Sequence, residues 1–150
     1  MLVVVPPSLI EAVGAPIRRV RRIHYVYDGQ ADTNFGPIEL TIGERPFLFD
    51  NEADGESLRV TETAWSDPFS EPLSAENRKF VLESGKWTAF DVSMLGQWAK
   101  LIDEPLSDVE AITNDAGKTT GIVLRTSHGG ALRLGVMADE LFVDGLVTPD

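Results

Sequence analysis

The chain has 150 residues, contains no cysteine and carries a formal net charge of −11 at pH 7. This length suits one domain with its own hydrophobic core, and the lack of cysteine excludes disulfides, thiolate nucleophiles and cysteine zinc sites. A chain with this much negative charge repels phosphate backbones and anionic lipid surfaces, and it attracts basic partners. We therefore expect a cytoplasmic protein that binds neither nucleic acid nor membranes.

The N-terminal segment gives no sign of export. Its apolar run covers only residues 2–5 and ends at Pro6 and Pro7, whereas a signal peptide needs roughly 7 to 15 apolar residues after a basic start. No uncharged apolar stretch approaches the roughly 20 residues that cross a bilayer. Because proline is tolerated in a first helical turn and Gly14 is a stop signal, residues 8–14 are expected to form a short helix.

Residues 17–63 are predicted to form a first antiparallel β-meander. Residues 17–27 are rich in β-branched and aromatic side chains, which favour strands, and residues 28–29 (Asp-Gly) supply a turn. Residues 28–83 carry thirteen acidic and four basic residues, so the negative charge is concentrated in this part of the chain. Three further strand-like segments follow the first, at residues 38–42, 47–49 and 58–63.

A connector of different composition, residues 64–105, comes next. Ser74 and Gly85 are suitable as the N-cap and the stop of a helix over residues 75–84. Apolar residues at helical spacing predict a second helix over residues 94–101. All three tryptophans lie in this connector. We therefore expect it to be helical and rich in aromatic residues.

Residues 106–143 are predicted to form a second meander with the same layout. An internal duplication, or a shared layout without common ancestry, would produce this likeness equally well. Neither meander could bury its apolar face alone. We therefore predict a mainly β (α+β) fold and a single domain over residues 1–150. In it, two four-stranded antiparallel meanders pack as a sandwich or join into a curved sheet or barrel. The second set of predicted strands lies at residues 106–113, 122–126, 131–136 and 141–143.

The most motif-like segment is residues 50–55, where acidic residues at alternate positions precede a glycine. Oxygen ligands at this spacing form the first half of a calcium-binding loop. The twelfth position of such a loop requires a bidentate Glu, but here it is Thr61, and the flanking segments are strand-like. A hairpin turn explains the same residues, so we predict neither a metal site nor another cofactor.

The two histidines offer little support for catalysis. His24 lies in a predicted strand, which indicates a structural role, and His128 precedes two glycines at a predicted hairpin tip. Acid–base catalysis by His128 would need a carboxylate within reach, and the nearest in sequence are Asp139, Glu140 and Asp144. Because no nucleophile motif accompanies them, we predict no catalytic residue and favour a non-enzymatic protein.

Arg18, Arg19, Arg21 and Arg22 form the main basic cluster. In a strand their side chains divide between the two faces and therefore make no single groove. One interpretation is a contact with an anion or nucleic acid; the other is a charged edge strand that discourages edge pairing. The negative charge of the whole chain favours the edge strand.

Two sets of residues are candidates for partner binding. The acidic residues of one predicted loop are close enough to act as one patch and are free to face outwards. Two tryptophans lie beside Pro, Gly or Ser in predicted loops, where an aromatic side chain is either a recognition anchor or a plug in the core. The candidate residues are Asp50, Glu52, Asp54, Glu56, Trp65 and Trp87.

These features favour a non-enzymatic module whose acidic surface engages a basic protein partner. The sharpest form of this hypothesis is a bacterial immunity or antitoxin-like protein that neutralises a basic nuclease or similar toxin, by analogy of charge and size. The alternative is a β-barrel or sandwich that binds a small ligand or acts as a hydrolase-type enzyme, with a pocket lined by connector aromatics and carboxylates. A deep pocket with a carboxylate pair or His128 would favour the alternative. An exposed acidic face with a loop tryptophan would favour the module.

Overall fold

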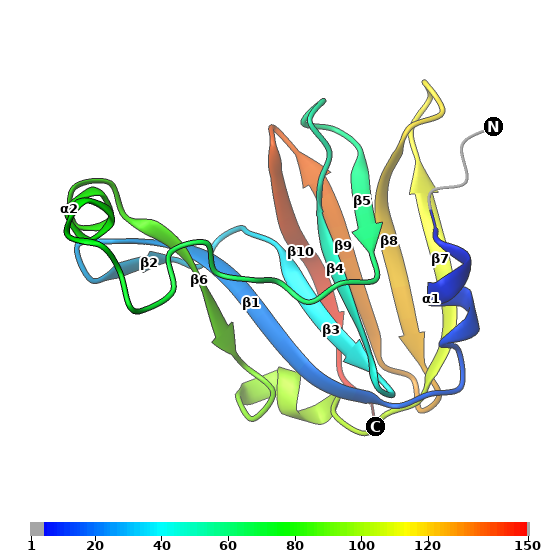
Figure 1. The fold of residues 1–150 in the computed structure, drawn as a ribbon. Helices are drawn as coiled ribbons and strands as arrows, with labels where there is room; N and C mark the ends of the chain where they lie inside the picture. The colour runs from blue at the N-terminus through cyan, green and yellow to red at the C-terminus, as the bar shows by residue number, and fades with distance from the viewer. Residues whose placement is uncertain (1–4, 150) are drawn as a thin grey trace.

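The chain folds into two antiparallel β-sheets with a short N-terminal helix (Figure 1). The computed structural model describes residues 5–149, so most of the apolar run at residues 2–5 lies outside the described residues. The helical elements are α1 (Pro7–Glu11), α2 (Ala75–Ser84) and the 3-10 helix η1 (Gly96–Lys100). The strands are β1 (Ile17–Tyr27), β2 (Gln30–Asp32), β3 (Ile38–Ile42), β4 (Arg45–Asn51), β5 (Leu58–Thr61), β6 (Lys86–Asp91), β7 (Leu106–Thr113), β8 (Thr119–Thr126), β9 (Ala131–Met137) and β10 (Glu140–Val147).

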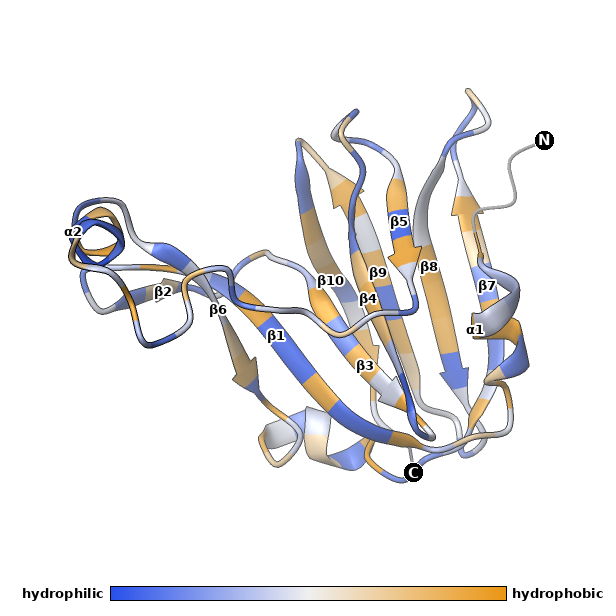
Figure 2. Cartoon of the chain, in the orientation of Figure 1, coloured by the Kyte–Doolittle hydropathy of each residue, from blue (hydrophilic) through white to orange (hydrophobic). Residues whose placement is uncertain are grey.

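Hydrophobic side chains from both sheets form one core. The six-stranded sheet has the order β2-β1-β3-β4-β5, with β6 also paired to β1, and the four-stranded sheet has the order β10-β9-β8-β7. Alternate residues of facing strands, such as Leu40 on β3 and Leu134 on β9, are fully buried between the sheets. Leu9 of α1 also belongs to this core. Figure 2 shows hydrophobic and hydrophilic segments following one another along β1.

The predicted mainly β fold is confirmed, as an open sandwich and not a closed barrel. The second meander has its four expected strands, β7 to β10. The first sheet has two strands more than predicted, because β2 follows the turn at Asp28 and β6 comes from the connector. The expectation of a loop around Lys86 and Trp87 is therefore wrong. Both residues pair with the end of β1, where Tyr25 lies opposite Trp87.

β1 is an interior strand over residues 21–26, so the interpretation of Arg21 and Arg22 as charges of an edge strand is wrong, whereas Arg18 and Arg19 precede the part that pairs with β6. β2 and β3 pair with one side of it, and β6 pairs with the other side. The pairing register shifts between Ile17 and Arg19, which changes the alternation of the side chains that follow. Arg22 lies opposite Ile38, a core residue, and is only 8% exposed, whereas Arg21 lies on the outer face.

The connector contains the predicted helix α2, within the expected bounds. The Ser74 hydroxyl accepts a hydrogen bond from the Asn77 N–H at 3.1 Å, as an N-cap should. The predicted second helix is a single short 3-10 helix, η1. With β2 and β6, α2 projects beyond the four-stranded sheet (Figure 1). None of the helices within residues 5–149 is long and apolar enough to cross a membrane.

Before α2, the connector runs across the outer face of the six-stranded sheet (Figure 1). Residues 62–74 have no regular secondary structure there. Side chains of the sheet hold this segment in place. Glu39 on β3 accepts a hydrogen bond from the Trp65 N–H at 3.0 Å, and Lys86 on β6 contacts Asp67 at 2.6 Å. This path places Trp65 over the outer side of β1, β3 and β4.

Candidate functional site

A pocket of about 290 Å³ on the outer face of the six-stranded sheet combines tryptophans with carboxylates. It lies where the connector, the end of β4 and the β9–β10 turn meet. Three of the six residues predicted to bind a partner line it. The lining residues are Ile23, Pro37, Asp50, Asn51, Trp65, Trp87, Asp139 and Glu140.

The two tryptophans reach the pocket in different ways. Trp87 is on β6, and its ring packs edge-on against Tyr25, with ring centroids 5.4 Å apart, and against Phe35, at 6.4 Å. Trp65 is held through its backbone, which contacts Glu39 and the guanidinium of Arg21. Both indoles are partly buried, so each contributes to packing while leaving part of its surface at the pocket.

Close backbone approaches fix the loops that surround the pocket. The Asp139 N–H donates to the Gly55 carbonyl at 3.0 Å, which joins the β9–β10 turn to the loop after β4. The Gly36 N–H donates to the Leu141 carbonyl at 2.9 Å. Gly36 has φ +134°, and a Cβ atom there would lie 1.9 Å from the Ile23 carbonyl oxygen. Glycine is therefore required at this position by conformation and by space.

The carboxylates of the pocket are only partly balanced by cations. Asp50 contacts Arg59 at 3.3 Å. Within residues 5–149, Asp139 and Glu140 form no ion pair. Burial raises the pKa of Glu140, and the neighbouring carboxylates of Asp139, Asp32 and Asp50 raise it further. A cation placed beside these carboxylates would relieve this repulsion.

The other acidic candidates have more local roles. Glu52 shares Arg59 with Asp50, at 3.6 Å. Asp54 accepts hydrogen bonds from the backbone N–H groups of Glu56 and Ser57 and therefore shapes its own loop. These bonds, with that of the Ser57 hydroxyl, hold the pKa of Asp54 far below its ordinary value. Lys118 neutralises part of the loop, lying 2.7 Å from Glu56 and 3.3 Å from Asp54.

The histidines lie elsewhere. His128 is exposed, and its Nδ1 is 2.9 Å from Glu104, not near the carboxylates that follow it in sequence. His24 is buried beside β6, with Nδ1 3.0 Å from the Phe35 carbonyl oxygen. Burial lowers its pKa, in keeping with a structural role. No group of metal-ligating side chains occurs in the part of the chain that the structure describes.

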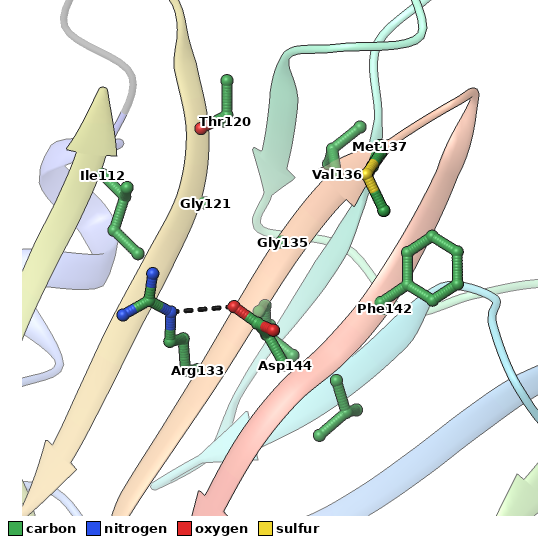
Figure 3. Close-up of a pocket in the computed structure, with 11 residues that line it drawn as sticks. Ile112, Thr120, Gly121, Arg133, Gly135, Val136, Met137, Phe142 and Asp144 are labelled. Atoms are coloured by element: carbon green, nitrogen blue, oxygen red, sulfur yellow. Dashed lines mark hydrogen bonds and ion pairs between the residues drawn. The ribbon is translucent and has the colours of Figure 1, made fainter. Parts of the chain in front are cut away.

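A second hollow, of about 430 Å³, lies on the outer face of the four-stranded sheet (Figure 3). Gly121 on β8 and Gly135 on β9 are register partners, so no side chain fills its middle. Its two charged residues, Arg133 and Asp144, form an ion pair with each other at 2.9 Å. This hollow therefore has no unbalanced charge with which to select a charged partner.

The structure thus brings Asp50, Trp65 and Trp87 together, whereas Glu52, Asp54 and Glu56 do not line the pocket. Asp139 and Glu140 were not among the predicted binding residues. The sequence signal for them was an acidic pair in a predicted turn, which says nothing about what the turn faces. No family model, curated protein or solved structure matches the chain.

Proposed function

We propose that this protein is a non-enzymatic acidic module that binds a basic protein partner. A lysine or arginine side chain of the partner enters the pocket between Trp65 and Trp87. The observation that carries the proposal is the convergence of these two indoles in one pocket with Asp139 and Glu140, which form no ion pair within residues 5–149. A bacterial immunity or antitoxin-like protein is the sharpest form of this function.

The chemistry of the pocket supports a cationic ligand. Indole faces attract ammonium and guanidinium groups through the ring quadrupole. Carboxylates form charge-assisted hydrogen bonds to the same groups. Glu140 is disfavoured as an anion in the free protein by burial and by its acidic neighbours. Binding of a cation would lower its pKa, so affinity should increase with pH as Glu140 ionises.

The size and the setting of the pocket support a side chain of a larger partner. Its volume of about 290 Å³ lies just below the range of roughly 300–1,000 Å³ typical of small-molecule sites. The surrounding segment is acidic, since residues 28–83 carry thirteen acidic and four basic residues. Such a field steers a basic partner towards the surface, while buried anchors determine how long it stays.

A second candidate function, small-ligand binding or hydrolase-type catalysis, is favoured by one observation. The pocket does hold more than one carboxylate, which is the feature expected of that alternative. Its lining contains no Ser, Thr, Lys or His side chain, so catalysis there would have to use the carboxylates themselves as nucleophile or as acid–base pair. Binding of a small organic cation is the form of this alternative that uses the indoles as well as the carboxylates.

The test is a titration followed by tryptophan fluorescence and calorimetry, with an oligo-arginine peptide and with ethylguanidinium as probes. We expect the peptide to bind more tightly than ethylguanidinium. Its association rate should fall as salt is raised from about 10 to 150 mM, because the Debye length shrinks from roughly 30 to 8 Å. Glu140→Gln should weaken peptide binding by about tenfold, as expected for loss of a charged hydrogen-bond partner.

Asp108→Asn provides the matched control. It removes the same charge from the chain, but Asp108 lies on β7 and does not line the pocket. If this variant weakens binding as much as Glu140→Gln, the pocket is not the binding site. If ethylguanidinium binds as tightly as the peptide, the small-ligand alternative replaces the protein partner. If neither probe binds, the proposed function is wrong.

A further inference from the structure

We propose that Arg21 and Glu39 are positioning residues, whose ion pair holds the backbone of Trp65 and thereby sets one wall of the pocket. The inference deepens the proposed function, and its first test needs no ligand. It concerns a segment of the connector that has no helix or strand of its own to hold it.

Two hydrogen bonds hold the backbone of Trp65, one to Glu39 and one from Arg21, and we call this arrangement the clamp. Glu39 Oε1 accepts hydrogen bonds from Arg21 Nη2 at 2.7 Å and from the Trp65 N–H at 3.0 Å. Arg21 Nη2 also donates to the Trp65 carbonyl oxygen at 3.0 Å. Both backbone polar groups of Trp65 are therefore satisfied by one ion pair, which takes the place of a neighbouring strand.

The positions of Arg21 and Glu39 are themselves fixed by the sheet. Arg21 and Glu39 are register partners on β1 and β3, so their side chains lie on the same face of the sheet. Glu39 is only 2% exposed. Burial alone would raise its pKa, but the hydrogen bonds from Arg21 and from the Trp65 N–H outweigh that effect and hold the pKa below its ordinary value. The carboxylate therefore stays ionised and keeps both of its contacts.

The side chains of Arg21 and Glu39 are 18% and 3% exposed, so this pair is more buried than the Lys86–Asp67 pair of the same segment, at 25% and 22%. The side chains of Arg45 and Glu62, for comparison, are 35% and 37% exposed, although they also approach to 2.9 Å. Ion pairs between exposed side chains are screened by water and add little to stability. Loss of one partner of a buried pair leaves the other as a buried, unpaired charge, so the arrangement resists change. The Trp65 backbone shares in this arrangement, so less ordering of this segment remains to be done when a ligand binds.

The first experiment measures amide hydrogen exchange in the free protein by NMR. Glu39→Met removes the carboxylate at nearly constant length, and we expect the Trp65 amide to exchange at least about tenfold faster, as for a lost charged hydrogen bond. The core amide of Leu40 should change less. Glu62→Met is the matched control, since it breaks the Arg45 pair close to Trp65 in sequence. Glu39→Gln keeps an acceptor oxygen and should restore part of the protection.

Equal acceleration at Trp65 in Glu39→Met and Glu62→Met would overturn the proposal. If Glu39→Met does not fold, Arg21→Lys replaces it. Lysine keeps the charge but lacks the planar fork that contacts both Glu39 and the Trp65 carbonyl. Faster exchange at Trp65 supports the clamp, and unchanged exchange refutes it.

A second readout is the affinity for the oligo-arginine peptide, which should fall about tenfold in Glu39→Met. Should the wild-type protein bind no peptide, the proposed function fails while the exchange result still decides the clamp.

Discussion

The Trp87→Ala substitution tests whether Trp87, which lines the pocket, also stabilises the fold through its packing. A buried tryptophan removes about 150–250 Å² from water, worth roughly 4–6 kcal/mol at about 25 cal/mol per Å². Trp87 is only partly buried, since one side borders the pocket, but it packs edge-on against Tyr25 and Phe35. We therefore expect Trp87→Ala to lower the free energy of unfolding by about 3 kcal/mol.

Urea denaturation and calorimetry measure this loss, which should appear as a fall in Tm of roughly 6–12 °C for a chain of this size. Trp87→Phe keeps an aromatic ring on β6 and should lose less than about 1.5 kcal/mol. A loss below about 1 kcal/mol in Trp87→Ala would refute the packing role. Dissociation of the oligo-arginine peptide, measured where the variant is folded, should be faster by an amount typical of a hot spot, about 2 kcal/mol or more.

Three further outcomes follow from the same structure. Arg22→Met should leave the stability unchanged or raise Tm. Arg22 is buried, its Nε has no hydrogen-bond partner in the described chain, and burial lowers its pKa. A fall in the free energy of unfolding of more than about 1 kcal/mol would contradict this prediction. Gly36→Ala should lower the free energy of unfolding by more than about 3 kcal/mol, because a Cβ atom there would clash with the Ile23 carbonyl. Gly117→Ala should lower it by about 1–2 kcal/mol, because a Cβ atom there meets open space and only the positive φ is unfavourable. Equal Tm values for the two variants would be inconsistent with the packing around Gly36. The pKa of Glu140 is raised in the folded state, so the folded protein retains this proton at pH values at which the unfolded chain has lost it. Stability should therefore fall as pH rises from the ordinary pKa of Glu to the raised value. Tm measured against pH should show a smaller fall for Glu140→Gln, and parallel curves would exclude the effect.

Most of the fold could be predicted because its signals are local. Alternating apolar residues marked the second meander, and Ser74 and Gly85 marked the ends of α2. β6 was missed because it begins directly after the helix stop, in a segment whose Gly and Lys suggested a loop. The interior position of β1 could not be predicted, since it depends on β6 pairing with its far side. The arginines of β1 are tolerated there because Arg21 is paired with Glu39 and Arg22 stacks on Trp98, 5.8 Å from the ring centroid.

The candidate site could be predicted in part. Charge and loop composition predict Asp50, Trp65 and Trp87 as binding residues, and all three line one pocket. Asp139 and Glu140 reach the same pocket from far along the chain, through the contact between the β9–β10 turn and Gly55. That contact depends on how the two sheets pack, and no local pattern encodes it.

The most direct test of the proposed function maps the peptide-binding surface by NMR. Backbone and indole N–H signals are followed while an oligo-arginine peptide is added at low salt. We predict that the largest shifts cluster at the indoles of Trp65 and Trp87 and at the amides of Asp50, Asp139 and Glu140. Shifts confined to the acidic loop around Asp54 and Glu56, or spread evenly over the acidic surface without the two indoles, would contradict the assignment of the pocket as the binding site.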